Sequence, residues 1–127
     1  MPVSEKAAME EAMQSISTMI ERSKKAQEKF QPGTSQHTLQ VNRIRALEIS
    51  VFLIESELAG SITNNAWTPE DMDKSLAPLK SLISKSEKAQ TKLKEDSWQY
   101  KMLDENLKAL HIALPLLERA IEELEQH

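Results

Sequence analysis

The stretch SKKAQEKF, residues 23–30, returns as SEKAQTKL at residues 86–93, a shift of 63 positions. Outward from these octapeptides, residues 16–58 align with residues 79–121 at the same shift and without a gap. Self-similarity at a fixed offset indicates one supersecondary unit that is used twice. The sequence therefore predicts two copies of one structural unit, which together account for most of the 127 residues.

Both copies have the composition of helices. Only two Gly and five Pro interrupt a chain that is rich in Ala, Leu, Glu, Lys, Gln and Ser, and residues of this kind favour long helices. Capping residues and turn signals predict where the helices begin and end. Four helices are expected: Ser4 to about Phe30, Thr34 or Ser35 to about Gly60, Thr68 to about Lys94, and Asp96 or Ser97 to about Glu125.

The start of the third expected helix has the strongest local signal. Thr68 is a suitable N-cap, and Pro69 occupies the first helical position, where its missing N–H costs nothing. Trp67 and Met72 have the spacing of a hydrophobic staple across this start. We therefore expect Trp67 to act as a structural clasp, and the alternative is a residue that stacks on a ligand.

Apolar residues alternate by four and three along each expected helix, as they do at Ile16 and Ile20 in the first copy and at Leu79 and Ile83 in the second. This spacing of about 3.5 residues is typical of helices that pack at shallow angles in bundles. We therefore predict an all-α fold, an antiparallel up-and-down four-helix bundle made of two duplicated helical hairpins. It forms a single domain over residues 1–127, with hairpin 1 at about 4–60, a linker at 60–68 and hairpin 2 at about 69–126.

The second and fourth expected helices carry an additional apolar stripe, so that apolar residues cover about 200° of each helix, roughly twice the usual core-facing arc. One explanation is that these two helices lie centrally and contact neighbours on both sides. The other is that part of the stripe is exposed and forms an interface with another molecule. The candidate interface consists of Leu39, Ala46, Ile49, Leu53, Met102, Ala109, Ile112 and Leu116.

Polar residues occupy apolar positions of the seam at equivalent places in both copies. If the hairpins pack with approximate two-fold symmetry, these residues meet and form a hydrogen-bonded layer that fixes the packing register. The alternatives are a small-molecule site between the hairpins and simple exposure near the end of the bundle. The candidate polar layer consists of Ser23, Gln27, Ser86 and Gln90.

Charge and composition exclude several classes of partner. The net charge of −4 and the isoelectric point of about 5.4 argue against nucleic acid, because binding to phosphates requires clustered Lys and Arg. The longest strongly apolar run is Val51–Ile54, too short to cross a membrane. No Cys is present, and Met1–Lys6 lack the pattern of a signal peptide. We therefore expect a cytoplasmic protein that binds neither nucleic acid nor membranes.

Signals for catalysis are weak. No Glu-x-x-His motif for a di-iron bundle, Gly-rich phosphate loop or Gly-x-Ser-x-Gly elbow occurs, and His37, His111 and His127 are scattered. Arg43 borders the apolar arc and is a candidate anion ligand, although a solvated rim position explains it as well. We predict no catalytic residue, no metal site and no cofactor.

These observations favour an interaction or regulatory module. Its partner is expected to be a second copy of the chain, as a dimer, or an amphipathic helix of another protein. The alternative is a small-molecule-binding helical bundle or an enzyme with a polar site between the hairpins. Architecture alone does not decide between these, because four-helix bundles serve many unrelated functions.

Overall fold

The computed structural model describes residues 2–60 and 67–125 and confirms an all-α protein of four helices. No strand occurs among these residues. The helices are α1 (Val3–Glu28), α2 (Ser35–Ala59), α3 (Pro69–Gln90) and α4 (Trp98–Glu125).

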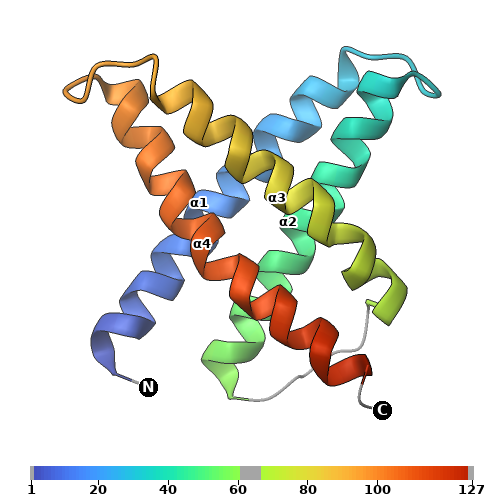
Figure 1. Ribbon diagram of the computed structural model, residues 1–127, viewed down its shortest axis with the longest axis vertical. Helices are drawn as coiled ribbons and strands as arrows, with labels where there is room; N and C mark the ends of the chain where they lie inside the picture. Colours follow the sequence, from blue (N-terminus) through green and yellow to red (C-terminus); the bar gives the residue numbers. More distant parts are fainter. Residues whose placement is uncertain (1, 61–66, 126–127) are drawn as a thin grey trace.

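Short turns join α1 to α2 and α3 to α4, and each pair forms a helical hairpin, hairpin 1 and hairpin 2 (Figure 1). The two hairpins cross like the arms of an X, and both turns lie at the top of the view in Figure 1. We call this the tip end, and it comprises residues 21–39 and 84–102. The opposite end, which we call the open end, comprises residues 2–11, 50–60, 67–74 and 115–125.

The crossing gives the helices unequal roles. Helix α1 packs against α2 and α4, α3 packs against α4 and α2, and α2 also contacts α4. Over the described residues, α1 and α3 do not contact each other. Helices α2 and α4 are therefore central, and a central helix needs apolar side chains on more than one face.

Matching helix ends recur at positions 63 residues apart. Helices α2 and α4 begin at such a pair, Ser35 and Trp98. The last turn of α1 tightens through bonds from Lys29 N to Ala26 O and from Phe30 N to Gln27 O, and the equivalent two bonds follow the end of α3. The tightened turn also explains why α1 and α3 end at Glu28 and Gln90, before the predicted ends. That the two hairpins are duplicates stays a prediction.

Side chains cap three of the four helix starts. Thr34 Oγ1 accepts a hydrogen bond from His37 N at 3.2 Å, and Ser97 Oγ accepts one from Tyr100 N at 3.2 Å. These residues are therefore the caps of α2 and α4, one of the two options predicted for each.

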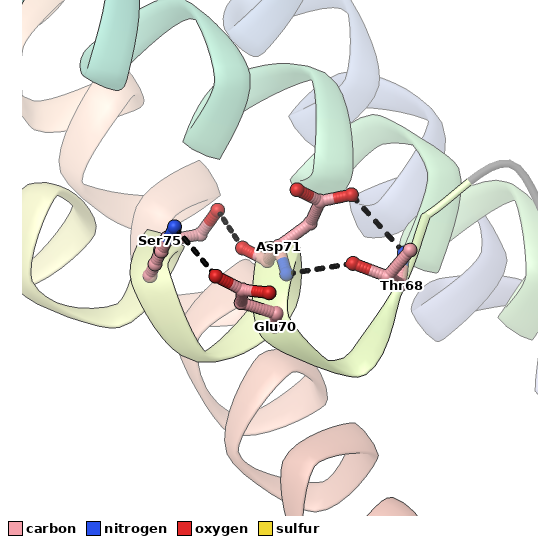
Figure 2. Close-up of polar contacts among 5 residues, drawn as sticks. Thr68, Glu70, Asp71 and Ser75 are labelled. Atoms are coloured by element: carbon pink, nitrogen blue, oxygen red, sulfur yellow. Dashed lines mark hydrogen bonds and ion pairs between the residues drawn. The ribbon is translucent and has the colours of Figure 1, made fainter.

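A reciprocal capping box begins α3. Thr68 Oγ1 accepts a hydrogen bond from Asp71 N at 3.1 Å, while Thr68 N donates to Asp71 Oδ2, also at 3.1 Å (Figure 2). Two backbone donors that the helix leaves unpaired are thereby satisfied. Trp67 packs against the core that contains Met72, as a structural clasp would.

The start of α1 differs from the prediction. The helix begins at Val3, directly after Pro2, and no side chain caps it. Ser4 therefore lies inside the first turn, and its prediction as N-cap is wrong. Pro2 has a φ of −59°, which its ring fixes and which suits the entry to a helix.

Small side chains are buried where hairpins 1 and 2 cross. Ala12 of α1 and Ala109 of α4 are 3% and 2% exposed and line the same cavity of about 90 Å³. Ser75 and Ala46, which lie 63 positions from Ala12 and Ala109, are each 1% exposed. Small residues at a crossing allow two helices to approach closely.

Candidate interaction surface

The second apolar stripe lies largely between the two hairpins of one chain. Ala46, Ile49, Leu53 and Ala109 are buried, and on α4 the neighbouring Ile112 lines the same small cavity against α1 as Ala109 does. Intramolecular packing accounts for these side chains, because α2 and α4 are the central helices. An interface through this stripe is thus restricted to its exposed or half-buried members, Leu39, Met102, Ile112 and Leu116.

The predicted polar layer does not assemble across the hairpins. Ser23 and Gln27 lie on α1, whereas Ser86 and Gln90 lie on α3, and these two helices do not contact each other. The two pairs therefore do not meet. The prediction failed because it assumed that the equivalent seams of α1 and α3 face each other, whereas the X-shaped crossing packs α1 against α4 and α3 against α2.

Each glutamine bonds within its own hairpin. Gln27 Nε2 lies 3.4 Å from His37 Nε2, and Gln90 Nε2 donates to Tyr100 O and Asp104 Oδ1, both at 3.4 Å. Both amides thus bridge the two helices of a hairpin just below its turn. Their role in the structure is to tie each hairpin together, and no site shared by the hairpins results.

Gln27 also lines an open depression of about 240 Å³ on hairpin 1, whose walls include Arg45, Glu48 and Trp67. Gln90 and Arg43 are not part of this depression. Burial lowers the pKa of Arg43, because a partly buried guanidinium is less favourable when charged. The polar residues considered for a ligand site are therefore dispersed over the molecule.

An exposed tryptophan rims a groove on the surface between α1 and α4, which begins at the tip end and continues toward the crossing. Trp98 is the first residue of α4, and 67% of it is exposed. The open groove beside it has a volume of about 350 Å³, with Met102 on the α4 wall and Ser15 and Thr18 on the α1 wall. We call this the tip groove.

Charged groups surround the apolar part of the tip groove. Arg22 Nη1 donates to Met102 Sδ at 2.9 Å and so lies over the thioether. Lys101 and Glu105 also line the groove. Trp, Met and Arg are the residue types enriched in the centres of protein–protein interfaces.

Sequence reasoning missed Trp98. The helix start was placed at Asp96 or Ser97, and Trp98 then falls outside the heptad seam and outside the second stripe. Its counterpart in the first copy is Ser35, an exposed polar residue. That contrast, a large aromatic where the other copy has a serine, is the signal that identifies the position.

Among residues 2–60 and 67–125, no group of three or more His, Asp or Glu side chains is arranged to hold a metal ion. None of the described helices is both long and apolar enough to cross a membrane. No protein family, curated protein or solved structure matches this chain.

Proposed function

We propose that this chain is a helical interaction module that binds a protein through the tip groove. The observation that carries the proposal is the exposure of Trp98 on the rim of a groove that contains Met102, whose thioether contacts Arg22. A single exposed apolar residue is ordinary on a protein surface. Trp98 differs because a partner that fills the groove would cover the indole and the thioether together.

Folding does not require an indole at this position. Ser97, not Trp98, caps α4, and the buried core consists of other residues. Covering an exposed indole removes a large apolar area from water, on the order of 25 cal/mol per Å². A partner therefore gains binding energy from Trp98 that the isolated chain does not use.

Site-specific photo-cross-linking tests this function. A benzophenone amino acid replaces Trp98 in one sample and His111, an exposed residue on the same helix, in the control. Each protein is irradiated alone and in lysate of the source cells. We expect discrete polypeptide adducts from position 98, with itself or with another protein, and few from position 111.

Equal, diffuse labelling from both positions would overturn the proposal. Because the benzophenone replaces the indole, the substitution Trp98→Ala provides the folding control. Its free energy of unfolding should stay within about 0.5 kcal/mol of that of the natural chain, as is usual for exposed positions.

A further inference from the structure

Large apolar side chains are exposed only at the two ends of the described part of the molecule. Phe30, Leu39 and Trp98 belong to the tip end, and Val3 and Leu124 belong to the open end. Their exposed fractions range from 37% for Phe30 to 85% for Val3. The middle of the X-shaped molecule, between these ends, has no such residue among those described.

The same two ends carry opposite charge. The tip end contains nine Lys and Arg against five Asp and Glu, a net charge of +4. The open end contains three Lys and Arg against twelve Asp and Glu, a net charge of −9. The charge of the chain is therefore separated along the long axis of Figure 1.

Helix dipoles account for only part of this separation. They favour the acidic first turns of α1 and α3 at the open end and the basic last turns of the same helices at the tip end. Crowding of like charges destabilises a compact state, and Glu122, Glu123 and Glu125 lie at the C-terminal end of α4, where the dipole disfavours them. Arg119, which pairs with Glu57 and approaches Glu123 at 4.0 Å, offsets only part of this negative charge.

We propose that the partner of the tip end is the open end of a second copy, so that the chains associate head to tail. This inference rests on the proposed function and names the occupant of its surface. Opposite net charges steer the two ends together, and the contact buries exposed apolar residues on both sides. Because the two surfaces differ, the contact is heterologous and builds open chains or closed rings of molecules rather than a two-fold dimer.

Charge-reversed variants test the arrangement, since they disturb exposed residues only. The tip variant carries Lys88→Glu, Lys92→Glu and Lys94→Glu, which change the net charge of the tip end from +4 to −2. The open-end variant carries Glu10→Lys, Glu11→Lys, Glu118→Lys, Glu122→Lys and Glu125→Lys, which change the net charge of the open end from −9 to +1. Circular dichroism checks that both variants remain helical, and Gln in place of Glu or Lys provides a milder set.

Sedimentation velocity measures the mass of each sample over a range of protein concentrations at low salt. The natural chain should grow beyond a dimer as its concentration rises, and salt should reverse this growth. Each variant alone should self-associate at least about tenfold more weakly, because its two ends have like charge. A mixture of the two variants should associate again, since every contact between unlike variants joins opposite charges.

A natural chain that stays at 14.4 kDa, a mass that stops at the dimer, or a mixture that fails to associate would each overturn head-to-tail assembly. Photo-cross-links from position 98 to another protein, without links between copies, would overturn this inference and leave the proposed function intact. The two failures are therefore distinguishable.

Discussion

Hairpin 1 and hairpin 2 place similar side chains at equivalent buried positions but begin their first helices differently. Leu47 and Leu110 are both fully buried, and Ser23 and Ser86 are 7% and 8% exposed. By contrast, α1 begins without a side-chain cap, whereas α3 begins with a capping box. The comparison shows that buried side chains at equivalent positions of the two hairpins have similar size and polarity. The starts of α1 and α3, at the open end, differ instead in whether a side chain caps them.

The largest effect on stability is expected from truncating the matched leucines, which tests whether the two hairpins are energetically equivalent. Leu47→Ala and Leu110→Ala should each lower the free energy of unfolding by about 2–5 kcal/mol, because each leaves a cavity at a fully buried position. Urea denaturation followed by circular dichroism measures both. Costs that differ by more than about 2 kcal/mol would show that the two hairpins are not energetically equivalent.

Pro115 distinguishes hairpin 2, because it lies inside α4 and hairpin 1 has Phe52 at the equivalent position. Pro115→Ala restores an N–H that can pair with the carbonyl of His111, and it should raise the free energy of unfolding by about 1–3 kcal/mol. Glu118→Ala, also exposed and on α4, is the control and should change stability little. A loss of stability on Pro115→Ala would mean that the packing of hairpin 2 depends on the proline.

The starts of α1 and α3 differ in whether a side chain caps them, and substitutions at Ser4 and Thr68 test this difference. Thr68→Ala removes the side-chain acceptor of the α3 cap and should cost about 1 kcal/mol. Ser4→Ala at the start of α1 should cost nothing measurable, because Ser4 caps no helix. Thermal unfolding of both variants measures the difference, and equal losses would contradict the assignment of the two starts.

The stability that the α3 capping box contributes should depend on pH, because Asp71 is one of its two members. Hydrogen bonds from the backbone and side chain of Thr68 lower the pKa of Asp71 in the folded chain. The ionised Asp71 carboxylate therefore adds to the free energy of unfolding at pH values above the ordinary carboxyl pKa. This contribution is lost as the pH falls below about 4. The difference in melting temperature between the natural chain and Asp71→Asn should shrink over that range, with Asp73→Asn as the control for lost charge. A difference that persists at a pH of about 2 would contradict this.

The smallest effect is expected at buried positions where one hairpin has Ser and the other has Ala. Ser50 and Ser75 each donate to the carbonyl four residues earlier, at 2.8 Å, and their counterparts are Ala113 and Ala12. Ser50→Ala and Ser75→Ala should change stability by less than about 1 kcal/mol, because only a local bond is lost. The reciprocal changes Ala12→Ser and Ala113→Ser test whether each site accepts both residues.

The helices could be predicted from the sequence because their signals are local. Caps such as Thr34 and Thr68, and apolar spacing such as that of Ile16 and Leu79, depend only on neighbours along the chain. The X-shaped crossing is not local, since it depends on which faces of four helices pack best. For this reason the meeting of Gln27 with Gln90 was predicted wrongly, although both glutamines were correctly placed just before the turns.

The candidate surface was harder to predict for a related reason. Trp98 is the exposed first residue of α4, and the groove beside it is lined by residues of both α1 and α4, which lie far apart in the sequence. The charge separation between the ends was contained in the sequence. It becomes visible only when residues distant in the chain, such as Glu10 and Glu122, are known to lie at the same end.

The two hairpins cross near their middles, with Ala12 and Ala109 at one of the contacts. If each hairpin moves as a rigid unit, rotation of one hairpin about this crossing spreads or closes both ends of the molecule together. A partner that wedges the tips apart would therefore also reshape the opposite end, although no residue there touches it.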